Sequence, residues 1–182
     1  MAPSDEELYR QMRKGDQQAF AELYERREPA LFRYALCLSG SRAVAEEVAH
    51  DAFLQLIGRD ARYDERRGPL EAYLYGVARN LIRVIRRRRT WEQETDQAVG
   101  FDLVADLIRD ERNAALHAAI RELPDSYRDA IVLCDLEEKS YEEAALLMKC
   151  PLGTVRSRVH RARMLLAARL KPLMLSAGAR GR

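Results

Sequence analysis

Two short helical patterns meet at a break between Ser140 and Arg163, and this pair constrains the fold more than any other stretch of the chain. The first pattern covers residues 141–148. Ser140 is placed to cap it, because a serine side chain accepts hydrogen bonds from free amides in a first helical turn. Pro151 and Gly153 punctuate the break, and proline is well tolerated at the start of the helix that follows. The sequence therefore predicts two helices joined by a tight turn.

The second of these helices separates its apolar and basic side chains onto different faces. Its apolar residues recur at spacings of four, three and four and form one stripe: Val155, Val159, Ala162 and Leu166. The other faces are basic, and no acidic residue occurs from Pro151 to Lys171. This pattern is typical of a helix-turn-helix whose second helix enters a DNA major groove. A solvated basic surface helix is the plainer alternative, but it leaves the turn and the stripe unexplained.

Charge is unevenly distributed along the chain. The 182 residues carry a net charge of only +2, and this length allows one domain or two small ones. Positive charge concentrates at residues 79–89 and 151–171, whereas negative charge concentrates between Glu92 and Glu111. This segregation favours local contacts with a polyanion on either side of an acidic connector.

Several classes of protein are disfavoured by what the sequence lacks. Cys37, Cys134 and Cys150 are far apart and form no zinc-type motif, so we expect buried free thiols in a reducing compartment. No stretch approaches the roughly 20 apolar residues of a membrane span. No paired-carboxylate, nucleophile or glycine-rich phosphate motif stands out. We therefore expect a cytoplasmic protein that is not an enzyme and has no metal site or cofactor.

Helical periodicity covers most of the chain, and no convincing strand appears. Two helices are expected from Glu6 onward, with a break at Gly15 and a cap at Asp16. Further helices are expected after Ser41, at residues 70–89, from residue 107 or 111 to 123, and from Pro124 to Leu133, with a polar loop at 58–69. The sequence thus predicts an all-α fold with two small helical domains joined by a flexible linker. Their bounds are residues 6–91, an acidic linker at 92–110, residues 111–173 and a disordered tail at 174–182.

The loop and helix at residues 63–83 carry the residue types that bind an unpaired DNA strand. Such a strand needs basic groups along its backbone, aromatic or amide groups for its bases and a pocket for a flipped base. These types are supplied by Tyr63, Tyr73, Tyr75, Arg79, Asn80 and Arg83. A core aromatic is the alternative for Tyr73, and a purely structural role is the alternative for Tyr63 and Asn80. The run Arg86–Arg89 suits phosphates, which give affinity and salt dependence without reading sequence.

Four stretches in order resemble the sigma-70 family of bacterial RNA polymerase initiation factors, in its extracytoplasmic-function (ECF) branch. They are residues 45–56, 63–81, 123–133 and the helix-turn-helix, and the match spans roughly residues 8–171. The resemblance implies that they are, in turn, the polymerase-binding helix, the reader of the melted −10 element, the opening of region 4 and the −35 reader. It also implies three partners: core RNA polymerase, through its clamp helices and flap; promoter DNA; and an anti-sigma factor that holds the protein inactive.

The resemblance assigns three sets of residues. The −35 set is Ser140, Tyr141, Thr154, Arg156, Ser157, Arg158, His160, Arg161 and Arg163. The −10 set is Tyr63, Asp64, Arg66, Arg67, Tyr73, Tyr75, Arg79, Asn80, Arg83, Arg86 and Arg87. The polymerase-binding set is Glu46, Glu47, His50, Asp51, Phe53 and Gln55, for which a merely solvated face is the alternative. Arg156 and Arg161 are the candidates for base edges, since an arginine fork to guanine is the commonest specific contact, whereas Arg158 and Arg163 suit phosphates.

The chain departs from the family pattern on both sides of the first helix of the helix-turn-helix. Lys149 stands where the family has the turn glycine, although a left-handed residue there favours glycine. Glu138 and Lys139 replace a usual glycine and an apolar residue. Two other functions stay open at this point. A stand-alone helix-turn-helix regulator needs only the C-terminal domain and a dimer interface. A sigma-mimicking adaptor that sequesters an anti-sigma factor should lack the basic DNA-facing residues that this chain keeps.

Overall fold

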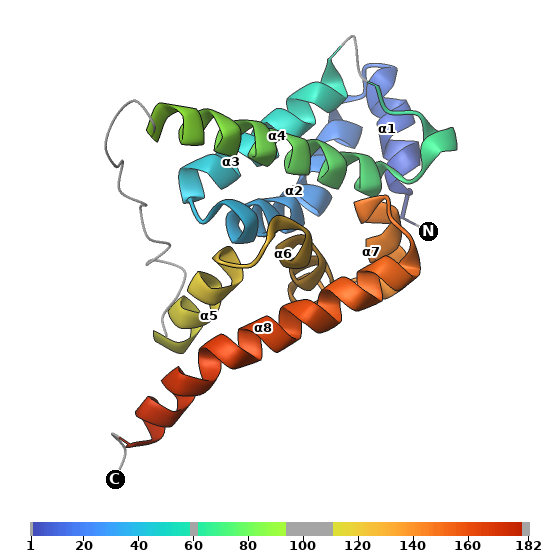
Figure 1. The fold of residues 1–182 in the computed structure, drawn as a ribbon. Coiled ribbons are helices and arrows are strands. Elements are labelled where there is room, and N and C mark those ends of the chain that lie inside the picture. The colour runs from blue at the N-terminus through green and yellow to red at the C-terminus, as the bar shows by residue number, and fades with distance from the viewer. Residues whose placement is uncertain (1, 59–61, 94–110, 180–182) are drawn as a thin grey trace. The chain divides into compact units, whose positions relative to one another are not determined.

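The computed structural model describes residues 2–58, 62–93 and 111–179, and the elements in these ranges are all helical (Figure 1). The all-α prediction is confirmed, with two helical domains. Two compact units are present, Met1–Leu36 with Arg42–Phe101, and Cys37–Ser41 with Asp102–Arg182. The predicted acidic linker falls almost entirely on residues 94–110, which lie outside the described residues.

The N-terminal unit contains α1 (Asp5–Arg13), α2 (Gln17–Ser39) up to Leu36, α3 (Arg42–Ile57), a short 3₁₀ turn η1 (Glu65–Arg67) and α4 (Leu70–Gln93). The predicted break between the first two helices is confirmed. Gly15 takes a positive φ of 98°, a conformation that glycine adopts without a steric cost. The Asp16 carboxylate then accepts hydrogen bonds from the amides of Gln18 (2.9 Å) and Ala19 (3.1 Å), which caps α2.

The core of this unit is built from the apolar faces of α2, α3 and α4, with α3 packed on α4 and α1 on the start of α4. The α3 stripe is buried as the sequence predicts, from Val44 through Val48 to Leu56. Two apolar residues of α3 lie outside it. Leu54 is 50% exposed and Ile57 is 43% exposed. The apolar surface of α3 therefore extends beyond the core.

The C-terminal unit contains α5 (Glu111–Arg121), α6 (Asp125–Ile131), a π turn η2 (Val132–Leu136), α7 (Tyr141–Met148) and α8 (Leu152–Ala179). The long α8, orange to red in Figure 1, packs against α5, α6 and α7. Its stripe from Val155 to Leu166 is buried, as the spacing predicts. Arg128 is also buried, and its guanidinium donates to the backbone oxygens of Ile120 (3.1 Å), Leu123 (2.7 Å) and Arg121. It thereby satisfies carbonyls at the C-terminal end of α5.

Three helix ends differ from the sequence-based boundaries. The helix expected to reach Leu133 passes into the π turn after Ile131, and α4 continues to Gln93. The helix α8 continues to Ala179, where a disordered tail was expected from residue 174. Leucine, alanine and methionine dominate this last stretch, and their high helix propensity favours continuation of the helix.

Among the residues that the structure describes, two other than glycine have left-handed backbones, and they flank α7. Lys149 has φ 52° and ψ 49°, the conformation for which the family pattern places glycine. The Lys149 amide donates to the Leu146 oxygen (3.2 Å) and the Cys150 amide to the Ala145 oxygen (3.1 Å), which is the hydrogen-bond pattern of a Schellman motif. Glu138, with φ 52°, occupies the other side of α7. Both positions where the family pattern has glycine thus keep a glycine-like backbone without a glycine.

Candidate nucleic-acid interface

The first helix of the helix-turn-helix begins with a reciprocal cap. The Ser140 hydroxyl oxygen accepts from the Glu143 amide (3.1 Å), and the Glu143 carboxylate accepts from the Ser140 amide (2.8 Å). Hydrogen bonds from Ser140, chiefly from its amide, lower the pKa of the Glu143 carboxyl. The Ser140 side chain, which the sequence assigns to DNA, is therefore already engaged in holding the start of α7, and Tyr141 beside it is half-buried.

The face of α8 opposite the buried stripe presents the candidates for base contact. Arg156, Ser157, His160 and Arg161 are exposed, and Thr154 is half-buried. The Ser157 hydroxyl donates to the Thr154 backbone oxygen (2.9 Å), which keeps it on the helix surface. The Arg161 guanidinium lies 3.3 Å from the Tyr127 hydroxyl, and that hydrogen bond raises the pKa of Arg161. The exposed face can approach a duplex without displacing core side chains.

The two candidates for phosphate contact have partners inside the unit. The Arg163 guanidinium donates two hydrogen bonds to the Asp135 carboxylate, at 3.0 and 2.7 Å, and so ties α8 to η2. This bidentate pair raises the pKa of Arg163. Arg158 is half-buried, with one guanidinium nitrogen 3.7 Å from the Cys150 sulfur. Arg163 therefore has its charge balanced locally by Asp135 in this structure.

One face of α4 gathers four of the seven candidates for single-strand contact that this helix carries. Tyr73, Asn80, Arg83 and Arg87 are separated by seven, three and four residues, which places them on the same side of the helix. Asn80, Arg83 and Arg87 are exposed and Tyr73 is half-buried. Arg79 and Arg86 lie half-buried on the flank of this face. We refer to the side of α4 that carries Tyr73, Asn80, Arg83 and Arg87 as the α4 face.

Gly76 lies on the α4 face between Tyr73 and Asn80. A Cβ at this position would meet no atom within 4 Å, so packing within the unit does not require glycine here. Glycine in a helix interior costs about 1 kcal/mol relative to alanine. The surface at Gly76 is accordingly bare backbone, open to close approach from outside.

Tyr75 belongs to the core instead of the α4 face. It is 2% exposed, and its ring packs edge-on against Tyr34 with 4.8 Å between centroids. Two residues along a helix from Tyr73 correspond to a rotation of about 200°, so the two side chains point to opposite sides. The structure therefore does not bring Tyr75 together with the other residues of the −10 set.

The loop before α4 is organised by its own side chains and by the half-buried Tyr63. The Asp64 carboxylate accepts from the Arg66 amide (3.0 Å) and caps η1, which leaves Arg66 and Arg67 exposed. The Tyr63 ring packs against Tyr9 (5.0 Å) and Tyr73 (5.5 Å). Its hydroxyl is buried, finds no hydrogen-bond partner among the described residues, and has a pKa raised chiefly by burial. Tyr63 anchors the loop from within.

The polymerase-binding set contains exposed residues and one core residue. Glu46, Glu47, His50 and Gln55 are exposed on α3 and Asp51 is half-buried. Phe53 is 1% exposed and packs against Tyr24, with 4.8 Å between centroids, so it is a core residue. The exposed apolar neighbours Leu54 and Ile57 were not in the predicted set. Leu54 is an apolar residue that does not fit the spacing of the buried stripe, and this misfit could have singled it out from the sequence.

The described residues lack two further kinds of feature. No three side chains among their histidines, cysteines and acids are grouped so as to hold a metal ion. Within the same ranges no helix combines the length and apolarity that crossing a membrane requires.

A helix-turn-helix unit with a basic face, together with a second helical unit that presents an aromatic and basic face, defines a two-domain helical DNA-binding protein. Comparison with known families makes the assignment narrower. The family model described as "Sigma-70 region 2" matches residues 23–92, and the family model described as "Sigma-70, region 4" matches residues 113–166. The chain belongs to the sigma-70 family of transcription initiation factors, as the sequence analysis predicted.

Relatives over nearly the full length support the ECF branch. The RNA polymerase sigma-H factor of Pseudomonas aeruginosa is 30% identical over 190 residues, covering 95% of this chain and 97% of that protein. The ECF RNA polymerase sigma-E factor of Escherichia coli (strain K12) is 31% identical over 192 residues, covering 94% and 96%. The ECF RNA polymerase sigma factor SigE of Mycolicibacterium smegmatis is 35% identical over 160 residues, covering 82% of this chain and 62% of that relative.

Two solved structures share the fold. The sigma factor RpoE from Bartonella quintana, in complex with the anti-sigma factor NepR, gives a TM-score of 0.67 at 27% identity, covering 84% of this chain and 96% of that chain. CnrH, in complex with the cytosolic domain of CnrY, gives a TM-score of 0.70 at 24% identity, covering 93% and 99%.

Proposed function

We propose that this chain binds core RNA polymerase and directs initiation at promoters that carry matching −10 and −35 elements. The observation that carries the proposal is the pairing of two surfaces with different chemistry on one chain. The exposed face of α8 has the guanidinium groups that read a duplex groove. The α4 face has the aromatic, amide and basic groups that bind an unpaired strand. The protein has no catalytic activity of its own, and it acts in the cytoplasm, where polymerase performs the chemistry.

The −35 duplex is read from α8. Arg156 and Arg161 contact base edges or the neighbouring backbone, with Ser157 and His160 on the same surface. Arg158 and Arg163 serve phosphates, and Arg163 can do so only by sharing its guanidinium between a phosphate and Asp135. Its contribution to affinity is therefore smaller than that of an unpaired arginine.

The −10 strand is captured by the N-terminal unit after the duplex melts. Asn80 contacts the non-template strand, Arg83 and Arg87 follow its backbone, and the loop with Arg66 and Arg67 bounds the site of the flipped base. The bare backbone at Gly76 lets the strand lie close to α4. Core polymerase binds the exposed side of α3, which includes its acidic residues and the exposed Leu54.

An anti-sigma factor regulates the protein by covering these surfaces. The support for this partner is the Bartonella quintana relative, which was solved in complex with the anti-sigma factor NepR. The exposed apolar side chains Leu54 and Ile57 supply the kind of surface that such a partner needs.

Run-off transcription with core polymerase on a genomic promoter library tests the function. We expect initiation at a subset of promoters that depends on the added chain. Arg156→Ala should weaken discrimination at −35, and Asn80→Ala should slow open-complex formation more than duplex binding. Gln17→Ala, which changes an exposed polar residue outside the two surfaces, is the control.

Two results would overturn the proposal. A folded chain that stimulates no initiation contradicts it outright. Tight, specific duplex binding by the isolated chain, with no effect of polymerase, indicates a stand-alone helix-turn-helix regulator instead. An equal loss from Arg156→Ala on promoters with scrambled −35 elements contradicts the assignment of that residue.

A further inference from the structure

We propose that α1 is a positioning element for the −10 loop, here the described residues 62–69, and that it takes part in selecting the −10 base. The inference rests on the proposed function. The helix α1 lies outside the match to region 2, which begins at residue 23. Four side chains on one face of α1, spaced by three, one and three residues, contact the loop and the helix ends on either side of it, the end of α3 and the start of α4. They are Glu6, Tyr9, Arg10 and Arg13.

The first anchor is at the end of the loop, where α4 begins. The Glu6 carboxylate accepts a hydrogen bond from the Leu70 amide (3.1 Å), the first amide of α4. Amides at a helix N-terminus lack partners within the helix, and a carboxylate is favoured there by the helix dipole. Burial raises the pKa of Glu6, but hydrogen bonds led by that from Leu70 outweigh it, and the net pKa is lowered. The charged form of Glu6 thus holds the start of α4.

The second anchor is at the end of α3. The Arg13 guanidinium donates to the backbone oxygens of Ile57 (3.3 Å) and Gly58 (3.1 Å), where α3 ends. Glu6 and Arg13 are seven residues apart, two turns of one helix, so α1 spans the distance from the end of α3 to the start of α4. A rigid helix bound at both places fixes the separation of the two ends.

The centre of the loop is held by side-chain packing. Tyr9 meets the Tyr63 ring edge-on at 5.0 Å, and Tyr63 in turn packs on Tyr73 of the α4 face. Arg10 lies 3.5 Å from the Glu65 carboxylate of η1. The Tyr63 ring therefore connects α1 to the surface that is proposed to hold the −10 strand.

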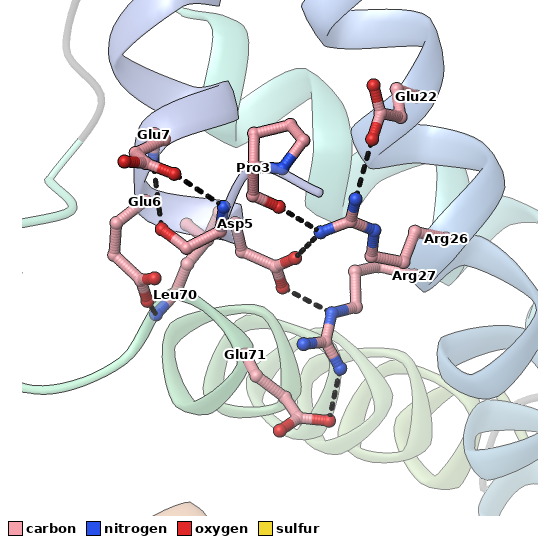
Figure 2. A network of polar contacts seen from close by, with 10 residues as sticks. Pro3, Asp5, Glu6, Glu7, Glu22, Arg26, Arg27, Leu70 and Glu71 are labelled. Carbon is pink, nitrogen blue, oxygen red and sulfur yellow. Dashed lines mark hydrogen bonds and ion pairs between the residues drawn. The ribbon is translucent and has the colours of Figure 1, made fainter. Parts of the chain in front are cut away.

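An ionic cluster around the buried Asp5 keeps α1 itself in place (Figure 2). Asp5 is 6% exposed, and its carboxylate pairs with Arg26 (3.0 Å) and with Arg27 of α2. Arg27 continues to Glu71 of α4 (2.7 Å), and Arg26 is also bound by Glu22 (2.6 Å). An ion pair with this much burial is lost only at a large cost, whereas exposed pairs contribute little. Because α1 cannot pivot freely, its contacts can impose a shape on the loop.

A loop shaped in advance binds a flipped base without a further loss of conformational freedom. Removing the Tyr9 ring should therefore reduce discrimination at −10 by about three- to tenfold, the range that one aromatic pair contributes. The −35 preference should not change, because it is read by the C-terminal unit.

The experiment uses the full chain with core polymerase on a promoter library randomised over both elements. Tyr9→Ala and Glu6→Ala should flatten the −10 base preference and leave the −35 preference intact. Tyr9→Phe keeps the ring, and Glu6→Gln keeps an acceptor for Leu70, so both should retain the wild-type preference. Gln11→Ala, which changes an exposed residue on the opposite side of α1, is the matched control.

Hydrogen exchange in the free chain gives a readout that does not depend on transcription. In Tyr9→Ala the amides of residues 64–70 should exchange faster, while those of α7 keep their wild-type rates. Unchanged exchange, or a wild-type −10 preference in Tyr9→Ala, overturns the inference. An equal loss of both preferences shows general destabilisation and also overturns it. If the wild-type chain initiates at no promoter, the proposed function fails, and the exchange data still decide whether α1 shapes the loop.

Discussion

The left-handed residues on either side of α7 lead to a prediction about stability. Lys149 and Glu138 both have φ 52°, where a Cβ is crowded by the following carbonyl and glycine is not. Lys149 is exposed, so a substitution there removes no core packing. We expect Lys149→Gly to stabilise the C-terminal unit, and Glu138→Gly to do the same at the other end of α7.

The magnitude follows from two opposing terms. A left-handed conformation costs an ordinary residue about 1–2 kcal/mol. Glycine relieves that cost but gives the unfolded chain more freedom, which offsets roughly 0.5–1 kcal/mol. The net gain is about 0.5–1 kcal/mol at each site. The two residues lie at separate ends of α7, so the double variant should gain about 1–2 kcal/mol.

Hydrogen exchange of the α7 and α8 amides in the full chain measures this gain. A gain of about 0.5–1 kcal/mol slows exchange through the same opening by roughly two- to fivefold, and the double variant should show the product. Lys149→Ala is the matched control, because alanine removes the charge and the long side chain but keeps the Cβ. If Lys149→Ala slows exchange as much as Lys149→Gly, the backbone conformation is not the cause and the reasoning fails.

Three further predictions follow from other features. Gly76→Ala should raise the free energy of unfolding by about 1 kcal/mol, as measured in a thermal melt. It should also shorten the lifetime of the open complex. Greater stability with an unchanged open-complex lifetime would show that the strand does not cross α4 there. Arg128→Met should lower the free energy of unfolding by roughly 3 kcal/mol, because carbonyls at the end of α5 lose their hydrogen-bond donor. Arg169→Met, which removes an exposed ion pair with Glu122, should lower it by less than about 1 kcal/mol. The folded pKa of Glu6 is lowered from 4.5, so its stabilisation is present above pH 4.5 and is lost as the pH falls through the folded pKa. Melting temperatures between pH 7 and pH 3.5 should therefore fall more steeply in the wild type than in Glu6→Gln, and parallel slopes would contradict this role of Glu6.

The helices themselves were predictable from the sequence, because each buries an apolar stripe with helical spacing. The stripe of α8 and the cap at Ser140 are local patterns, and both are present in the structure. The left-handed site at Lys149 could also be anticipated from the family pattern. In these cases the residues that interact lie within a few positions of one another.

Residues that carry two plausible roles were harder to place. Tyr63, Tyr75 and Phe53 are aromatic residues beside polar ones, and residue type alone does not separate a base contact from a core side chain. Each packs against a ring from another element: Tyr63 against Tyr9, Tyr75 against Tyr34, and Phe53 against Tyr24. Such pairings join positions 29 to 54 residues apart, and no local sequence pattern predicts them.

The contact between α1 and the start of α4 has a consequence for the order in which the chain folds during synthesis. Glu6 leaves the ribosome early, but its partner amide at Leu70 is made 64 residues later. At about 5–20 residues per second this delay lasts roughly 3–13 s. The helix α1 can therefore pair with α2 through Asp5 before α4 is made, but its contact with Leu70 forms only after α4 has emerged. A ribosome that pauses before Leu70 leaves α1 without the amide that Glu6 binds, and the loop with Tyr63 without its anchor at the start of α4.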